Sequence, residues 1–214
     1  MKTEKPLQPG DAKQPRKPVQ PRSIQTREKI LDAALVLFCE RGYFKTTTNE
    51  IARRAGVSIG SLYSYFRDKD TLFFEILERY NAKFTAAKND AFSQPELLRT
   101  DPARWLQLLI DGLIRVHEES RELNRELTVI SYYKPEVAEV LERNKRRTIE
   151  TIGGYFEQYG DKLKIGDPQA AAVAAFDLIS STVDRVTFGN PQPGRERVIN
   201  AAIAMLLAFF DRVT

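Results

Sequence analysis

Residues 26–72 form the segment that most restricts what this chain can fold into. Its first part, residues 24–41, carries apolar side chains at the i, i+3, i+4, i+7 and i+8 positions of a helix, and Gly42 then suits the left-handed conformation that ends a helix. Two shorter segments follow, separated by Gly56, and each begins after a hydroxyl residue that can cap a helix, Thr47 or Ser58. The pattern predicts a supporting helix and two short helices joined by a sharp turn.

Helical periodicity continues through the rest of the chain, and no alternating strand pattern persists. A fourth helix is expected from Lys69 to about residue 89. The pairs Asp101-Pro102 and Asp167-Pro168 each combine a cap with a proline at the first helical position. The predicted fold is all-α with about nine helices, the later ones over residues 102–119, 121–132, 135–159, 168–187 and 194–212.

Charge and composition divide the chain further. Residues 1–24 hold six basic and two acidic residues, which account for the whole net charge of +4. Because residues 1–22 are also rich in proline and poor in apolar side chains, they predict a disordered basic arm, which either lies along DNA or is passive. We expect this arm to be followed by a three-helix helix-turn-helix domain over residues 23–72 and a larger helical bundle over residues 73–214.

Several classes of protein are disfavoured. One cysteine and one histidine exclude an internal disulfide framework and a His/Cys zinc cluster, so no metal is expected. The sequence contains no phosphate-binding loop or nucleophile elbow, so we expect no enzyme, no catalytic residue and no cofactor. No apolar run reaches the roughly 17–25 residues that cross a bilayer, which predicts a cytoplasmic protein without a membrane partner.

The second of the two short helices has an outer face suited to DNA. With Leu62 and Phe66 turned inward, the opposite face carries glycine, hydroxyls and tyrosines, and an α-helix fits the major groove. Gly60 permits close approach and Ile59 suits a thymine methyl group, while hydroxyls and a cation suit phosphates. The alternative is a plain helical hairpin inside an all-α core. The expected DNA-contacting residues are Thr47, Thr48, Asn49, Ser58, Ile59, Gly60, Ser61, Tyr63, Ser64, Tyr65 and Lys69.

Residues 27–72 resemble the DNA-binding domain of the TetR family of bacterial regulators. The resemblance implies a homodimer that binds a palindromic operator in double-stranded DNA, and a C-terminal domain that dimerises and binds a small-molecule effector. It implies repression as the default mode. Ile59 departs from the polar or basic residue that relatives often have there, and Thr48 replaces a commonly apolar residue. The matching residues are Gly42-Tyr43-Phe44, Thr46-Thr47, Ile51-Ala52, Ala55-Gly56-Val57-Ser58, Gly60-Ser61-Leu62-Tyr63, Tyr65-Phe66 and Lys69.

The last two helices are the candidate dimer interface. The segment 194–212 is apolar almost all round, so it must be covered on several sides, and the alanine-rich segment 168–187 permits close approach. We expect both to pair with their symmetry mates as a four-helix interface, whereas ordinary burial within one monomer is the alternative. The expected interface residues are Ala174, Leu178, Ile203, Leu206 and Phe210.

The middle helices supply a candidate effector pocket, because apolar and aromatic side chains line most small-molecule sites. The same side chains serve equally well as a bundle core. Asp177 and Asp184 either recognise a polar ligand group or pair with arginines such as Arg197. A second hypothesis is a constitutive DNA-binding or protein-recruiting module of the same fold without an effector. The expected ligand-binding residues are Trp105, Leu109, Leu113, His117, Tyr132, Tyr155 and Phe176.

Overall fold

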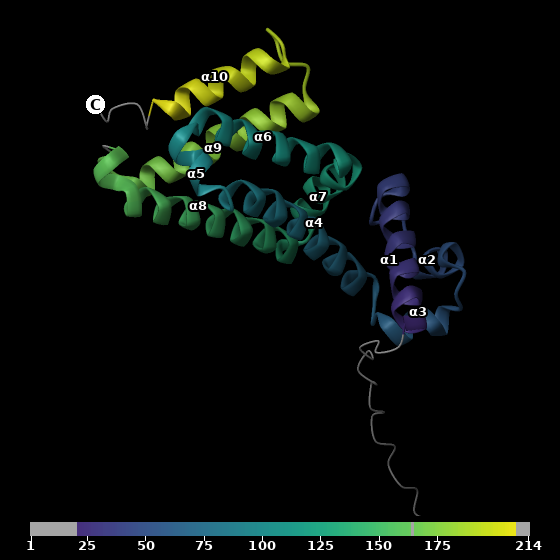
Figure 1. The fold of residues 1–214 in the computed structure, drawn as a ribbon. Coiled ribbons are helices and arrows are strands. Elements are labelled where there is room, and N and C mark those ends of the chain that lie inside the picture. The colour runs from purple at the N-terminus through teal and green to yellow at the C-terminus, as the bar shows by residue number, and fades with distance from the viewer. Residues whose placement is uncertain (1–20, 164, 209–214) are drawn as a thin grey trace, which may run out of the picture. The chain divides into compact units, whose positions relative to one another are not determined.

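The computed structural model describes residues 21–163 and 165–208, without the side chains of residues 159–163. Within these ranges the chain forms ten α-helices and no strand (Figure 1). None of the helices in these ranges is both long and apolar enough to span a membrane. The helices are α1 (Pro21–Arg41), α2 (Thr48–Ala55), α3 (Ile59–Tyr65), α4 (Lys69–Phe92), α5 (Pro95–Thr100), α6 (Pro102–Glu119), α7 (Arg121–Tyr133), α8 (Pro135–Leu163), α9 (Pro168–Phe188) and α10 (Arg195–Leu207).

The all-α prediction is confirmed, with one helix more than the pattern indicated. The additional helix is α5, whose N-cap Gln94 makes no side-chain capping bond, so the usual start signal is missing from the sequence. Helix α1 begins at Pro21, within the residues expected to be an arm, and the other residues of that arm, 1–20, lie outside the described part of the chain. The expected end of the last helix, residues 209–212, also lies outside it.

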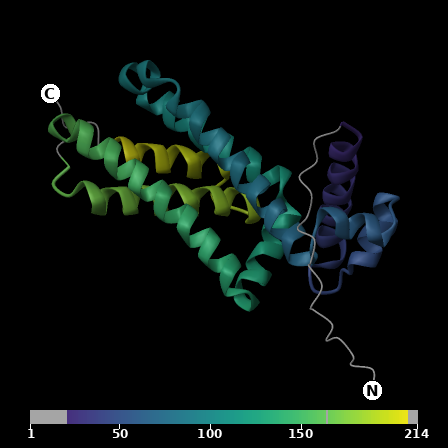
Figure 2. The ribbon, with the colours of Figure 1, turned by 90° about the horizontal axis from the view of Figure 1, so that it is seen from below.

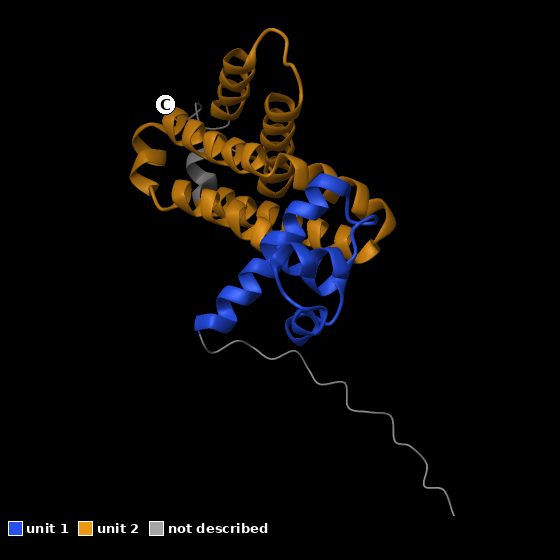
Figure 3. Cartoon of the chain, turned by 90° about the vertical axis from the view of Figure 1, so that its right-hand side faces the viewer, with its two compact units in different colours: residues 1–76 blue, residues 77–214 orange. Residues whose placement is uncertain are grey.

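The chain divides into two compact units, and the division falls within α4 between Ile76 and Leu77 (Figure 3). We call residues 21–76 unit 1 and residues 77–208 unit 2, each taken over its described residues. Helix α4 is continuous and contributes buried side chains to both units, among them Phe73 in unit 1 and Tyr80 in unit 2.

Unit 1 is built around the apolar stripe of α1. Phe38 of α1, Phe66 at the end of α3 and Phe73 of α4 are its largest fully buried side chains, and the rings of Phe38 and Phe73 lie 6.0 Å apart between centroids. Ile51 of α2 and Leu62 of α3 are 0% exposed. Burying each such side chain stabilises the fold by about 1.5–3 kcal/mol. Helices α2 and α3 are therefore held by packing rather than by their own length.

The N-terminus of α4 is tied to the turn between α1 and α2. The Lys69 ammonium donates hydrogen bonds to the backbone oxygens of Tyr43 (2.8 Å) and Thr46 (2.9 Å) and lies 4.2 Å from the centroid of the Tyr43 ring. The Tyr43 hydroxyl donates to Asp70, and burial together with this bond raises the pKa of the Tyr43 phenol. These contacts fix the turn that leads into α2.

Unit 2 is a bundle in which α9 packs against α6, α8 and α10 (Figure 2). The buried indole of Trp105 on α6 donates from Nε1 to the backbone oxygen of Ala91 on α4, at 2.8 Å. A Cβ atom added to Gly112 of α6 would lie 3.5 Å from the Cβ of Ala87 on α4, so these two helices approach closely there. The core combines apolar side chains of α4, α6, α8, α9 and α10, including Ile110, Ile114, Phe156, Ala172, Ile179, Val183, Ile199, Ile203 and Leu206.

Candidate nucleic-acid interface

The two short helices of unit 1 are fixed by their caps. The Thr47 hydroxyl accepts a bond from the Glu50 N–H (3.3 Å) and the Glu50 carboxylate accepts one from the Thr47 N–H (2.9 Å), which forms a capping box at the start of α2. Gly56 ends α2 with φ +68°, a conformation that other residues adopt only with strain. The Ser58 hydroxyl then accepts the Ser61 N–H at 3.1 Å and starts α3. The geometry is a helix-turn-helix.

Helix α3 turns one face to the core and the other outward. Leu62 is fully buried, whereas the side chains of Ile59 and Tyr63 are 37% and 50% exposed. Gly60 and Ser64 lie on the same exposed face. This outer face, made by Ile59, Gly60, Tyr63 and Ser64, contributes little to the core of unit 1.

A hydrogen bond joins the outer face of α3 to the start of α2. The hydroxyl oxygens of Thr48 and Tyr63 lie 3.0 Å apart, and Tyr63 is half exposed. Asn49 is exposed beside Thr48. The structure thus brings together on one surface the two helices from which DNA contacts are expected.

Packing within the protein does not require a glycine at position 60. A Cβ atom added to this residue would meet no other atom within 4 Å, and its backbone is helical. Since glycine lowers helix stability by about 1 kcal/mol relative to alanine, the absence of a side chain is a cost to the fold. The small residue is explained if another molecule approaches the helix backbone at this position.

Several of the expected contact residues have partners within the protein, among them Lys69, Thr47 and Tyr65. Lys69 is half-buried and bonds the backbone oxygens of the preceding turn, so it is not placed as an outward cation. The Thr47 hydroxyl donates to the Glu50 carboxylate (2.9 Å), and bonds from the Thr47 backbone and hydroxyl lower the pKa of that carboxyl. The Tyr65 hydroxyl lies 3.1 Å from the Ser23 hydroxyl of α1. These residues orient the helices, whatever else they contact.

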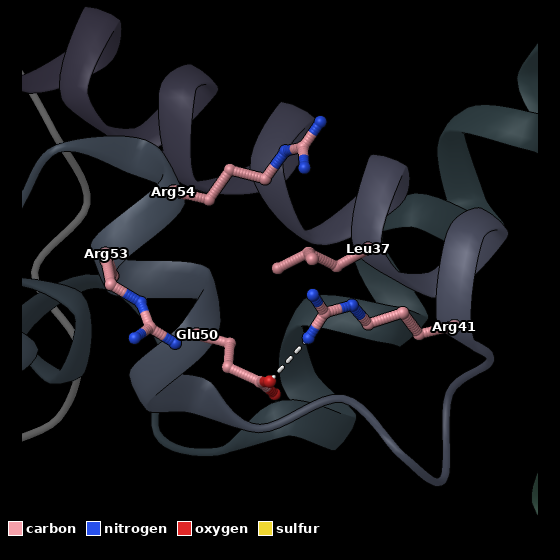
Figure 4. Close-up of a pocket in the computed structure, with 5 residues that line it drawn as sticks. All are labelled: Leu37, Arg41, Glu50, Arg53 and Arg54. Carbon is pink, nitrogen blue, oxygen red and sulfur yellow. Dashed lines mark hydrogen bonds and ion pairs between the residues drawn. The ribbon is translucent and has the colours of Figure 1, made fainter.

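An open hollow of about 340 Å³ lies between α1 and α2 (Figure 4). Arg41 pairs with Glu50 (2.7 Å) and Arg54 pairs with Glu40 (3.1 Å), all at the surface. Exposed ion pairs of this kind contribute only about 0–1 kcal/mol. The sequence did not indicate this arrangement, because the charges come from two helices. The hollow is lined by Leu37, Arg41, Glu50, Arg53 and Arg54.

The expected effector residues of unit 2 separate into three groups. Trp105 and Leu109 are core residues, each 6% exposed. Tyr132 is 84% exposed on α7, so the structure does not bring it together with the others. The remaining residues are half-buried: Leu113, His117, Tyr155 and Phe176.

A polar network at His117 joins three helices of unit 2. The side-chain amide nitrogen of Asn124 on α7 donates to the Tyr80 hydroxyl of α4 and lies within bonding distance of His117 Nδ1 on α6, both at 2.8 Å. The neutral imidazole therefore accepts at Nδ1 and carries its proton on Nε2. Phe84 and Phe188 contact the ring at centroid distances of 4.7 and 5.6 Å. The sequence singled out His117, but neither Tyr80 nor Asn124.

Among the described residues of one protomer, the two aspartates of α9 do not pair with Arg197, and a pairing across a dimer stays a prediction. Asp177 lies 3.9 Å from Lys145 of α8, at the surface. Burial raises the pKa of Asp184, and the nearby His117 opposes this rise. Burial lowers the pKa of His117 in turn, against the influence of Asp184. This mutual effect places the two side chains near each other, at the outer end of the polar network.

The expected dimer residues lie on two different faces. Ile203 and Leu206 are 7% and 3% exposed and belong to the core of unit 2, whereas Ala174 is exposed and Leu178 half-buried. Phe210 lies outside the described residues. Because α10 is apolar almost all round after its first turn, the sequence could not tell its inner stripe from its outer one. The outward apolar residues are Ala170, Val173 and Ala174 on α9 and Ala201, Ala204 and Met205 on α10, with Ala208 at the C-cap of α10.

The single histidine gives the stability of the protein a defined pH dependence. Its folded pKa lies below the ordinary 6.5, so the unfolded chain takes up the proton first. The free energy of unfolding is therefore highest above the ordinary pKa and falls as the pH drops from that value toward the lower folded pKa. Urea denaturation at several pH values measures this slope.

The variant His117→Asn is the control, because its amide oxygen can accept the Asn124 bond without titrating. Asp184 gives stability the opposite pH dependence, because its raised pKa means that the folded protein takes up this proton before the unfolded chain does. The variant does not substitute Asp184. The slope difference between the two proteins therefore reports His117 together with its coupling to Asp184. Equal slopes would contradict the burial of this imidazole.

Comparison with known proteins is consistent with the geometry of unit 1. The family profile described as "Bacterial regulatory proteins, tetR family" matches residues 30–76. The HTH-type transcriptional regulator AcrR of Shigella flexneri is 37% identical over 114 residues, which cover 52% of this chain and 50% of AcrR. The chain spans about half the length of the curated relatives it matches.

Solved structures match over most of the chain. A putative TetR-family transcriptional regulator from Mesorhizobium loti MAFF303099 is 26% identical, with a TM-score of 0.66 over 88% of this chain and 98% of that one. SmeT, solved as a complex with triclosan, shares the fold at 23% identity, with a TM-score of 0.61 over 88% of this chain and 94% of its own. The helix-turn-helix of residues 30–76 is therefore a DNA-binding domain of the kind found in the TetR family of bacterial regulatory proteins.

Proposed function

We propose that this protein is a ligand-responsive repressor, which binds a palindromic operator as a homodimer and is released from it by a small, largely apolar effector. The observation that carries the DNA-binding part is the outer face of α3, with Gly60 in open space and the Tyr63 hydroxyl bonded to Thr48. A helix with a bare backbone position and outward hydroxyls fits the major groove. Ile59 offers an apolar contact for a thymine methyl group.

A selection from random duplexes tests this proposal. At about 150 mM salt, the full-length protein is expected to enrich a palindromic motif, with half-sites spaced by one helical turn or a multiple of it. Tyr63→Ala should lose the motif, because it removes both the exposed ring and the bond to Thr48. Val129→Ala, which truncates an exposed side chain of α7, is the control and should keep it. Motif-free binding that vanishes with salt would contradict the proposal.

Gly60→Ala separates DNA contact from folding. The added methyl group meets nothing within 4 Å in the protein, so the free energy of unfolding should stay the same or rise by up to about 1 kcal/mol. Affinity for the selected operator should fall roughly tenfold or more, about 1.4 kcal/mol, because the methyl group occupies space needed by DNA. Gly154→Ala, in open space on α8, is the control for the stability effect and should bind normally. Unchanged operator affinity in Gly60→Ala would place the DNA elsewhere.

The homodimer is supported by the outer stripe of α9 and α10 in unit 2. Met205 and Val173 are 61% and 44% exposed, and the residues beside them on the same stripes are mostly alanines. Small side chains permit two helices to approach closely, and an apolar stripe on two neighbouring helices is what a four-helix interface buries. A palindromic operator requires this twofold symmetry.

Ala204→Arg tests the interface. A charged side chain buried without a partner at the centre of the stripe should weaken the dimer by about 3 kcal/mol or more. Sedimentation velocity should show a dimer for the wild type and a monomer for the variant. Val129→Arg, which adds the same charge at an exposed apolar residue of α7, should remain dimeric. A dimeric Ala204→Arg protein would move the interface away from α10.

Release would act through α4, which is one helix with buried side chains in both units. Matching major grooves in B-DNA are about 34–36 Å apart, so a shift of a few ångströms in the separation of the two α3 helices would misalign one of them. An effector achieves this only if it binds the two states with different affinity. SmeT binds triclosan within a similar fold, which supports a small-molecule effector for this chain.

The second candidate function is a constitutive regulator of the same fold. It predicts that operator affinity stays the same when unit 2 is saturated with a bound compound. A compound that binds the folded state also raises the melting temperature, so binding and operator release can be measured separately.

A further inference from the structure

Lys88 is a cation on the inner face of α4 in unit 2. It is half-buried, and its ammonium donates to the Thr148 hydroxyl of α8 at 2.9 Å. That hydroxyl in turn donates to the backbone oxygen of Asn144, at 2.9 Å. Among the described residues, the neutral hydroxyl of Thr148 is therefore the only hydrogen-bond partner of this ammonium.

No carboxylate compensates the charge of Lys88 in the part of the chain that the structure describes. Burial alone lowers the pKa of this lysine, with no contribution from a neighbouring acid. Lys83, an exposed residue of the same helix, shows the usual arrangement, since it pairs with Glu119 at 3.7 Å. A cation drawn away from water costs free energy unless an anion and further acceptors satisfy it. Two of the three donors of Lys88 are open to such an anion.

Aromatic side chains flank Lys88 on the same face of α4. Phe84 lies one turn before it and contacts the His117 ring at 4.7 Å between centroids. Phe92 lies one turn after it, and its ring is stacked on Tyr155 of α8 at 4.9 Å and packs against Trp105 at 5.3 Å. The ammonium is thus bordered along the helix by apolar surface from α4, α6 and α8.

We propose that Lys88 binds the carboxylate of an otherwise apolar effector, aliphatic or aromatic, whose body lies along the side chains of Phe84 and Phe92. The proposal rests on the proposed function, since it assigns a chemical class to the effector of unit 2. The incoming carboxylate supplies the missing charge, and a charge-assisted bond in a partly dry site is about twice as strong as a neutral one. Thr148 orients the ammonium toward the acid.

Matched acids and amides test the chemical class. The full-length protein is titrated at neutral pH with decanoate, decanamide, phenylacetate and phenylacetamide, and binding is followed by calorimetry and by the emission of Trp105, the single tryptophan. At least one acid should bind roughly tenfold or more tightly than its amide. Lys88→Met should remove this preference while leaving amide binding unchanged. Lys83→Met, on the same helix, should behave as wild type.

The outcomes separate this proposal from the proposed function. Equal binding of acid and amide, no binding of either acid, or acid binding that survives in Lys88→Met would overturn the role of Lys88. If the amides alone bind and release the operator, the effector function stands and the acidic class fails. If acids bind through Lys88 but the operator is never released, the class stands and ligand-responsive repression fails.

The melting temperature of the unliganded protein tells whether Lys88 has a purely structural role. If the ammonium is an uncompensated charge, Lys88→Met should raise the melting temperature of the unliganded protein, because methionine fills similar space without a charge. A lower melting temperature in Lys88→Met than in Lys83→Met would mean that the bond to Thr148 serves the fold, and would overturn the proposal.

Discussion

The bonds of one ammonium group set the geometry on which the helix-turn-helix depends. Lys69 sits at the first position of α4 and holds two backbone oxygens of the turn before α2, while Tyr43 in that turn packs its ring on Phe73, at 5.1 Å between centroids. These contacts therefore hold the turn against the start of α4. Since α2 begins directly after this turn, the direction of α2, and through Gly56 that of α3, follows from this clamp.

Much of unit 1 could be predicted from the sequence because its signals are local. Thr47, Gly56 and Ser58 are caps whose side chains or conformations act within a few residues, and each has the expected role in the structure. Lys69 shows where such reasoning stops. A lysine at a helix start next to a DNA-binding motif suggests a phosphate contact, which stays a prediction. Its bonds to the turn could not be predicted, because those partners lie more than twenty residues away in sequence and only the folded chain brings them together.

Unit 2 was less predictable, for two physical reasons. Where nearly every side of a helix is apolar, as in α10, periodicity does not say which stripe faces the core. In the structure Ile203 and Leu206 lie inward while Met205 lies outward. Polar groups in a bundle interior find partners on other helices, so Asn124 between Tyr80 and His117 leaves no pattern along the chain. Lys88 did leave a pattern along the chain, since it falls on the same helical stripe as Phe84 and Phe92. A lone lysine on such a stripe is easily overlooked.

The outer face of α3 also affects how the sequence of such a protein can vary. A helix of seven residues is far shorter than the roughly 12–15 residues at which an isolated helix becomes even marginally stable, so α3 takes its shape from Leu62, Phe66 and the core beneath them. Ile59, Gly60 and Ser64 take no part in that core. Substitutions at these outward positions can accumulate with little cost to folding. The surface that we propose to read the operator can therefore diverge between relatives while the scaffold that presents it stays the same.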